Sequence, residues 1–281
     1  AQGCTSFNEI IAKGYGEPQS AKEFAELAQW VNYDGHRSLF ESRSQNRKGL
    51  LMWMSHSCWP SMVWQTYDYY FEPTAAYFAI KKASEPLHIQ WNPATDEVEV
   101  VNYSAGTHKG LTAKVQVLNM DASVAWEKEA TVDSNEDTTD KCIKLEFPEN
   151  LSKVHFIKMT LTEDGKVVSD NFYHRSLEEN NYQDLCQLAK VALQSATTVD
   201  KNADGTWSAV SVIENKTSTP ALMIRLNVVD GKDDQQILPV FYSDNYFSLL
   251  PGEKKEVRMS WRDEDTRGNE GKVLITGYNV E

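Results

Sequence analysis

Basic residues are scarce in this sequence: 28 Lys and Arg stand against 41 Asp and Glu, which gives a formal charge of −13. Proteins that bind nucleic acid or anionic membrane surfaces need clustered Lys and Arg, so we expect no nucleic-acid partner and no membrane partner. No apolar run approaches the roughly 18 residues of a membrane-spanning helix. The opening residues AQGCTSFNEI lack the basic and apolar regions of a signal peptide, which still allows export if the chain is mature or a piece of a longer one.

Cysteine is also rare, and its four copies, Cys4, Cys58, Cys142 and Cys186, are scattered. No two of them form a CxxC pair, and none clusters with histidines at the spacing of a zinc site. We therefore expect no zinc site, and we assign no metal ligand and no cofactor to the chain. A single disulfide remains open, because pairing cannot be read from spacing alone.

The first 84 residues favour helices. Ser20 and Glu23 match a capping box, and apolar residues at helical spacing follow them, which predicts one long helix to about Arg43 despite Gly35. The short apolar run Leu50–Met54 comes next and indicates a strand that is buried on both faces. One helix feeding one such strand is a unit of an α/β fold.

From residue 85 onward, short runs with partial apolar alternation predict strands separated by polar turns. A first set comprises Leu87–Trp91, Val98–Tyr103, Leu111–Leu118, Val154–Leu161 and Val167–Tyr173. After a helical link at Asn181–Leu188, a second set comprises Lys190–Thr198, Trp207–Asn215, Ala221–Val229, Tyr246–Leu250, Glu256–Trp261 and Val273–Tyr278. Each set has the length of an immunoglobulin-like sandwich, about 100 residues. The prediction is a mainly β chain with domains at 1–84, 85–188 and 189–281.

The densest group of aromatic and polar side chains follows the predicted strand directly. It comprises WMSHSCWPS at 53–61, WQ at 64–65 and YDYYF at 67–71. Ligands bind at the carboxyl ends of parallel strands, where loops converge on an open crevice. Rings that stack on sugar C–H faces, together with polar groups that pair with hydroxyls, suit a carbohydrate. The alternative is that these rings seal a junction between domains.

Other acidic and histidine motifs give weaker evidence for a functional site. Asp200–Gly205 resembles the start of a calcium loop, but the twelfth position is Ser211 instead of Glu, so a hairpin turn explains it better. Asp263–Asp265 is expected to be a solvated hairpin tip. His56 has no Ser-His-Asp order or nucleophile elbow around it. The carboxylates Asp68 and Glu72 could face one another, but no catalytic pair is assigned.

The string GLLMWMSHSCWPSMVWQTYDYYFEPTAAYFAIKKASEPLHIQWN, residues 49–92, closely resembles the end of the catalytic barrel in glycoside hydrolase family 2. The branch it resembles holds exo-β-glucosaminidases and β-mannosidase-like enzymes, including plant-type endo-β-mannosidases. Residues 12–49 look like the last long barrel helix of that branch. SDNFYH at 169–174 and PVFYSDNYFSLLPGE at 239–253 resemble strands of its two C-terminal sandwiches.

The resemblance implies a retaining glycosidase with two glutamates, an acid/base and a nucleophile. Residues 50–55 would be the eighth strand of a (β/α)8 barrel, so both glutamates would lie upstream of Ala1. This chain would then be a C-terminal part without catalytic residues. Its partners would be a carbohydrate, bound through the complete barrel, and the N-terminal domains of the same polypeptide, in a periplasmic or secreted location. A non-catalytic carbohydrate-binding or structural sandwich module remains the alternative.

Three candidate substrate-binding residues come from the same resemblance. Trp53 matches a tryptophan that walls the sugar pocket, Trp59 matches a second one that lines the approach, and His56 lies between them. The commoner form of the motif, WMLNSAWPS, differs here at Ser55, His56 and Cys58. The resemblance therefore leaves β-mannosides and β-glucosaminides both open as substrates.

An isolated barrel strand would leave backbone groups unpaired, each at a cost of roughly 1 to 3 kcal/mol. Such a remnant is expected to disorder, to refold as an irregular or helical segment against the first sandwich, or to pair with another copy. Of these we favour docking against the first sandwich, with Trp53 as a packing residue. A chain lacking residues 1–60 should then stay folded and become more soluble.

Overall fold

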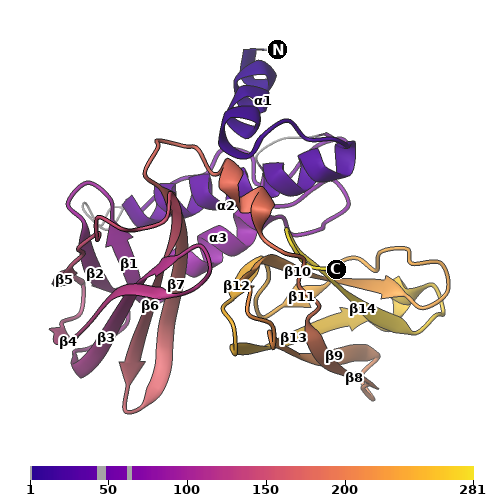
Figure 1. The fold of residues 1–281 in the computed structure, drawn as a ribbon. Coiled ribbons are helices and arrows are strands. Elements are labelled where there is room, and N and C mark those ends of the chain that lie inside the picture. The colour runs from indigo at the N-terminus through magenta and orange to yellow at the C-terminus, as the bar shows by residue number, and fades with distance from the viewer. Residues whose placement is uncertain (1, 43–48, 62–64) are drawn as a thin grey trace. The chain divides into compact units, whose positions relative to one another are not determined.

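The computed structural model describes residues 2–42, 49–61 and 65–281 (Figure 1). The chain divides into two compact units: residues 1–52 with 79–187, and residues 53–78 with 188–281. Helices are few, namely α1 (Gln2–Tyr15), α2 (Ala21–Ser42), α3 (Ala75–Ala83) and the 3-10 turns η2 (Gln183–Gln187) and η3 (Asp263–Thr266). Each unit contains two antiparallel sheets, so the predicted mainly β class with two sandwiches is confirmed.

The first sandwich has one sheet of three strands and one of four, in the orders β1-β2-β5 and β4-β3-β6-β7. Its strands are β1 (Leu87–Asn92), β2 (Glu97–Asn102), β3 (His108–Asn119), β4 (Val124–Ser134), β5 (Thr138–Lys144), β6 (Val154–Glu163) and β7 (Lys166–Ser176). All pairings are antiparallel. The five strands predicted in this region are all present.

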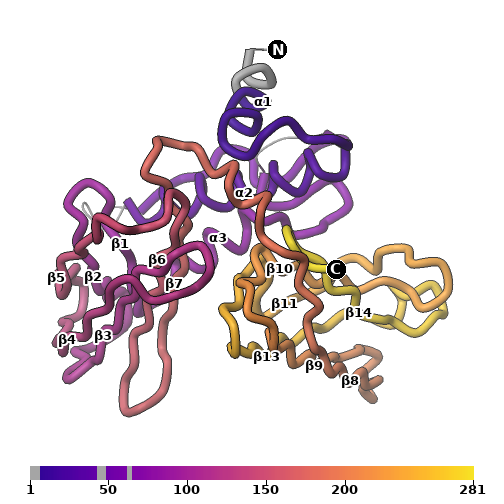
Figure 2. The backbone as a smooth tube through the Cα atoms, viewed as in Figure 1, coloured from indigo at the N-terminus to yellow at the C-terminus, as the bar shows by residue number. Residues whose placement is uncertain are grey.

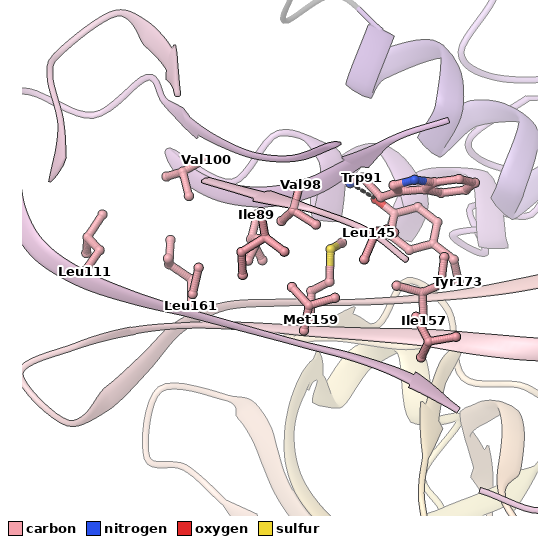
Figure 3. Close-up of a cluster of buried hydrophobic side chains, with 14 of the residues drawn as sticks. Ile89, Trp91, Val98, Val100, Leu111, Leu145, Ile157, Met159, Leu161 and Tyr173 are labelled. Carbon is pink, nitrogen blue, oxygen red and sulfur yellow. Dashed lines mark hydrogen bonds between the residues drawn. The ribbon is translucent and has the colours of Figure 1, made fainter. Parts of the chain in front are cut away.

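Alternating apolar residues build the core between these sheets. Along β3, Leu111, Ala113, Val115 and Val117 are all fully buried, as period-two alternation requires for one face of a strand. Figure 3 shows the opposing sheets contributing side chains such as Ile89 and Met159 to the same cluster. The phenol of Tyr173 lies at one end of this cluster, where it accepts a hydrogen bond of 3.2 Å from the backbone N–H of Trp91.

Two strands, β4 and β5, were not predicted, and both lie at sheet edges. An edge strand keeps one side open to solvent, so charged side chains interrupt its apolar pattern. In β4, Trp126, Ala130 and Val132 pack against the core, but Lys128 falls in the same row of side chains. The alternation that marks a half-buried strand is therefore broken by charge.

The second sandwich repeats this plan, with sheets in the orders β12-β10-β14 and β11-β13-β9-β8. Its strands are β8 (Gln194–Lys201), β9 (Thr206–Glu214), β10 (Ala221–Asp230), β11 (Phe241–Tyr242), β12 (Phe247–Leu249), β13 (Lys254–Arg262) and β14 (Gly271–Thr276). Of these seven strands, only the two-residue strand β11 was not predicted from the sequence. The core includes Trp261, which is 2% exposed and stacks parallel to Trp207 at 6.4 Å.

The two acidic motifs singled out in the sequence lie in loops of this sandwich. The segment Asp200–Gly205 closes the β8–β9 hairpin (Figure 2), as predicted, and Asp204 Oδ1 accepts hydrogen bonds from the backbone and side chain of Thr206. The cluster Asp263–Asp265 is not a hairpin tip, because it forms η3 between strands of different sheets. There, Asp263 accepts hydrogen bonds from Lys201 and from Trp207 Nε1, both in the same sandwich.

Helix α2 begins as predicted. The Ser20 hydroxyl accepts the backbone N–H of Glu23 at 3.1 Å, while the Glu23 carboxylate accepts the backbone N–H of Gln19 at 2.7 Å. The helix continues through Gly35 to Ser42, and the predicted end at Arg43 lies outside the described residues. Its buried face carries Leu27, Ala28, Trp30 and Phe40 together with two charged residues, Arg37 and Glu41. No helix of the described ranges is long and apolar enough to cross a membrane.

The predicted strand Leu50–Met54 is wrong. These residues form no ladder in the structure, and the side chain of Leu51 is fully exposed. The segment is irregular, one of the three outcomes expected for a strand without neighbours. The predicted docking on the first sandwich is also wrong for the aromatic residues, since 53–78 cluster with the second sandwich and Trp53 is 80% exposed.

Candidate functional site

Exposed rings gather in one stretch of the chain, which we call the aromatic segment: residues 53–61 and 65–74. Among the described residues, six Trp, Tyr or Phe side chains are exposed, and five of them belong to this segment: Trp53, Trp59, Tyr69, Tyr70 and Phe71. The sixth is Phe241 of β11. Soluble monomers seldom group exposed apolar side chains in this way without a partner or ligand to cover them.

Backbone hydrogen bonds tie the two halves of the aromatic segment together. The carbonyl of Ser55 accepts the backbone N–H groups of Thr66 and Tyr67, both at 3.1 Å, and the Thr66 hydroxyl at 2.8 Å. Further along, the carbonyl of Thr66 accepts the backbone N–H of Thr74 at 2.9 Å. The segment lacks regular secondary structure, but it is held in a definite shape.

Buried polar side chains reinforce this arrangement. Ser57 is 3% exposed and donates its hydroxyl to Gln65 Oε1, and Gln65 is itself 7% exposed. Burial and the neighbouring Tyr77 raise the pKa of Tyr67 to about 12, so its phenol stays protonated at neutral pH. Such groups can support the rings around them, but they are not acids or bases in this pH range.

The loop 68–72 presents three of the exposed rings. One carboxylate oxygen of Asp68 accepts the backbone N–H groups of Tyr70 and Glu72 at 2.8 and 2.9 Å. The backbone N–H of Asp68 in turn donates to the carbonyl of Glu72 at 3.0 Å. The Asp68 carboxylate therefore stabilises the backbone of this loop. It is not paired with the Glu72 carboxylate as a second catalytic group.

The predicted binding residues occupy different environments. Trp53 and Trp59 are exposed, at 80% and 68%, so their rings are open to a ligand. His56 is half-buried and stacks on Phe71 with ring centroids 4.6 Å apart and nearly parallel planes. Its Nε2 is buried without a hydrogen-bond partner. All three residues lie in the continuous stretch 53–59 of the aromatic segment, and Trp64 lies outside the described residues.

A second group of ionisable side chains lies in the first unit, between α2 and the sandwich. His88 is 1% exposed and lies between Glu41 Oε1 at 3.2 Å and Glu85 Oε2 at 3.1 Å. Glu41 Oε1 also accepts hydrogen bonds from Asn171 and from the Tyr173 phenol, each at 2.9 Å. Glu41 is buried and Glu85 is partly exposed, and donors occupy both carboxylates. We therefore infer that this group holds the helix to the sandwich and does not act on a substrate.

His88 gives this buried group a dependence on pH. Burial opposes its protonation, but the hydrogen bonds and charges of Glu41 and Glu85 outweigh burial and raise the pKa above its usual value. A raised folded-state pKa stabilises the fold fully below about pH 6.5, the unfolded value, and this contribution is lost as pH rises through the folded-state pKa. Burial lowers the pKa of His174, so this residue has the opposite effect on stability. Its protonation in the unfolded chain destabilises the fold as pH falls below about 6.5.

We therefore expect His88→Gln to flatten the pH dependence of unfolding above pH 6.5. The free energy of unfolding of the unsubstituted chain, measured in urea, should fall more steeply between about pH 6.5 and 8 than that of the variant. Parallel profiles for the two chains in that range would show that His88 is not protonated in the folded state.

The described residues contain no group of three or more His, Cys, Asp or Glu that could hold a metal ion. Cys58, Cys142 and Cys186 are free thiols, and the side chain of Cys4 lies outside the description. Burial raises the pKa of Cys142 to about 12, so this thiol is not a nucleophile at neutral pH.

Comparison with known families gives two matches. Residues 171–280 match the exo-β-D-glucosaminidase Ig-fold domain, and residues 96–176 match the mannosidase Ig/CBM-like domain. The regions correspond to the second and first sandwiches, and they overlap at residues 171–176, which lie within β7.

Curated relatives match almost the entire chain. An exo-β-D-glucosaminidase of Streptomyces avermitilis is 31% identical over 98% of this chain, and one of Hypocrea jecorina is 29% identical over 98%. A mannosylglycoprotein endo-β-mannosidase of Lilium longiflorum is 25% identical over 94%. The chain spans only about a third of the length of these relatives, 34% in each case.

Solved structures agree. The Amycolatopsis orientalis exo-chitosanase superposes with a TM-score of 0.91 and 29% identity, over 98% of this chain and 36% of its own. A β-D-mannosidase of Dictyoglomus thermophilum, at 17% identity and a TM-score of 0.74, has the same fold over the whole chain. The chain therefore carries the Ig-fold domains of the exo-β-glucosaminidase and mannosidase group of glycoside hydrolase family 2, and corresponds to a C-terminal portion of those enzymes.

Proposed function

We propose that this chain is the C-terminal part of a retaining exo-β-glycosidase that removes terminal β-glucosaminides. The observation that carries the proposal is the aromatic segment, a preformed set of exposed rings within a chain whose relatives include exo-β-D-glucosaminidases. Glucosaminides are favoured over mannosides because glucosaminidase relatives match 98% of this chain at up to 31% identity, whereas an endo-β-mannosidase matches 94% of it at 25%.

In this proposal residues 1–84 are the end of a (β/α)8 barrel, whose other strands are needed to give residues 50–55 their neighbours. The exposed Leu51 and the irregular backbone around it are what an unpaired barrel strand would look like. The two catalytic glutamates would belong to the rest of the barrel, with their carboxyl groups about 5 to 5.5 Å apart, as retention requires. This chain would supply Trp53 as a wall of the sugar site and Trp59 on the approach to it.

Each group in this chain has a non-catalytic role in the proposal. The indole of Trp53 would stack on the C–H face of the terminal sugar and exclude water from it. The shape of the segment fixes where that ring can lie, through Ser55, Asp68 and the His56–Phe71 stack. Bond cleavage would be performed by the glutamates outside this chain.

A sugar-binding module formed by the sandwiches alone is the rival function, and the match of residues 96–176 to a CBM-like domain favours it. Such modules bind sugars on exposed rings, and no exposed Trp, Tyr or Phe occurs within residues 84–187, all of which are described. Phe241 is the exposed ring of the second sandwich. We therefore propose a structural role for the sandwiches.

Hydrolysis assays test the proposal. The complete polypeptide is expected to release p-nitrophenol from the β-D-glucosaminide faster than from the β-D-mannoside, and the 281-residue chain is expected to release it from neither. Turnover by the 281-residue chain would refute the placement of the glutamates outside it. Failure of the complete polypeptide on both substrates would refute the function itself.

A periplasmic or secreted location is part of the same proposal, because polysaccharide fragments are met outside the cytoplasm. Fractionation of the source cells, with antibodies against the complete polypeptide, is expected to find it in an exported fraction. Recovery in the cytosol would contradict this.

A further inference from the structure

A charged contact joins the aromatic segment to the second sandwich. Glu72, the last residue of the loop 68–72, accepts a hydrogen bond on its Oε1 from Arg225 Nη2 of β10. Both residues belong to the same compact unit. Their side chains are only 20% and 28% exposed, so solvent screens this ion pair less than it screens a surface pair.

The surroundings of Arg225 restrict the movement of its side chain. β10 is the middle strand of its sheet, and Arg225 pairs with Thr276 of the neighbouring strand β14. Its guanidinium also lies 5.9 Å from the ring centroid of Tyr246, a residue that is 6% exposed. A middle strand and a buried ring leave the guanidinium little freedom to move.

The loop 68–72 connects Arg225 to the exposed rings. Glu72 is bound through its backbone to Asp68 in both directions, so the ion pair holds the turn that carries Tyr69, Tyr70 and Phe71. Phe71 then stacks on His56, which lies three residues from Trp53. A short chain of contacts therefore runs from β10 to the part of the segment that carries Trp53.

We propose that Arg225 is a positioning residue for the sugar site: by holding Glu72 it fixes the aromatic segment on the second sandwich, so that this immunoglobulin-like domain sets the affinity for the terminal sugar. The inference rests on the proposed function. It also assigns the second sandwich a role in substrate binding that needs no contact between the sandwich and the sugar.

Hydrogen exchange in the 281-residue chain tests the tether without any need for activity. Arg225→Met and the isosteric Glu72→Gln are each expected to speed amide exchange in residues 65–74 by about ten-fold, since local opening controls exchange in such loops. The double variant should add little to either single change, and Arg225→Lys, which keeps the charge, should restore most of the protection.

The matched control is Lys255→Met. Lys255 pairs with Asp244 in the same sandwich, and these side chains are 24% and 23% exposed, close to the values for Arg225 and Glu72. This variant should leave exchange in residues 65–74 unchanged. Unchanged exchange in both Arg225→Met and Glu72→Gln would overturn the proposal, and so would additive effects in the double variant.

Kinetics of the complete polypeptide give the second readout. With p-nitrophenyl β-D-glucosaminide, Arg225→Met is expected to raise KM about five-fold and to change kcat less than two-fold, because the ion pair acts on binding and not on the glutamates. A loss confined to kcat would overturn the positioning role. If the unsubstituted polypeptide hydrolyses neither glycoside, the proposed function fails, while hydrogen exchange still decides whether Arg225 holds the segment.

Discussion

Replacing Glu41 by alanine is expected to lower the free energy of unfolding of the chain by about 3 to 5 kcal/mol, the usual cost of removing one partner from a buried charged network. One oxygen of this carboxylate receives hydrogen bonds from His88, Asn171 and Tyr173, and its side chain is 8% exposed. Alanine would leave the raised-pKa imidazole of His88 without its countercharge on the helix side. Urea unfolding at pH 6 measures the effect.

Two further variants make this prediction sharper. Glu41→Gln keeps the shape and the acceptor oxygen but removes the charge, so it should lie between the parent chain and Glu41→Ala. Glu26→Ala is the control on the same helix, because Glu26 forms an exposed pair with Lys22, a type worth about 0 to 1 kcal/mol. A loss at Glu41 no larger than the loss at Glu26 would contradict the account of the buried network.

The same network changes the expectation for deleting residues 1–60. That deletion removes the buried face of α2, including Trp30, Arg37 and Glu41, and leaves His88 and Asn171 without their partners on the helix. The structure therefore indicates that α2 is an integral part of the first unit. A deleted chain should be less stable than the parent.

Most of the helices and strands could be predicted from local sequence patterns. The capping box at Ser20 predicted the start of α2, and apolar alternation predicted the strands that form the middle of each sheet, such as β3 and β6. The strands that were not predicted, β4, β5 and β11, all lie at sheet edges. Solvent permits charge in an edge strand, so β4 has Lys128 among its core-facing residues, and β11 is only two residues long. Leu50–Met54 failed for a different reason, since apolar composition predicts a buried strand only if neighbouring strands are present.

The candidate site was predicted only in part. Trp53, His56 and Trp59 share one dense run of sequence, so composition and family resemblance were sufficient to single them out. Arg225 could not be found in this way, because its partner Glu72 is 153 positions away and a lone arginine in a strand carries no local signal. Glu41 and His88 likewise meet only through the packing of α2 on the sandwich. Long-range ion pairs were missed, whereas motifs continuous in sequence were found.

Replacing Trp53 in the complete polypeptide tests the central claim, that the aromatic segment forms part of the sugar site. Trp53 is 80% exposed and makes little contribution to the packing of this chain, so its removal should not unfold it. If the indole stacks on the terminal sugar, Trp53→Ala should cost about 2 kcal/mol or more of transition-state binding, typical of a central aromatic contact. That loss corresponds to roughly a thirty-fold fall in kcat/KM.

The decisive measurement is kcat/KM for p-nitrophenyl β-D-glucosaminide in Trp53→Ala, Trp53→Phe and Phe241→Ala. Phe241 is the matched control, an exposed ring at 70% on the second sandwich outside the aromatic segment. We predict a large loss for Trp53→Ala, a partial recovery for Trp53→Phe, which keeps a ring, and parental activity for Phe241→Ala. Equal values of kcat/KM for Trp53→Ala and Phe241→Ala would contradict the claim that the aromatic segment forms part of the sugar site.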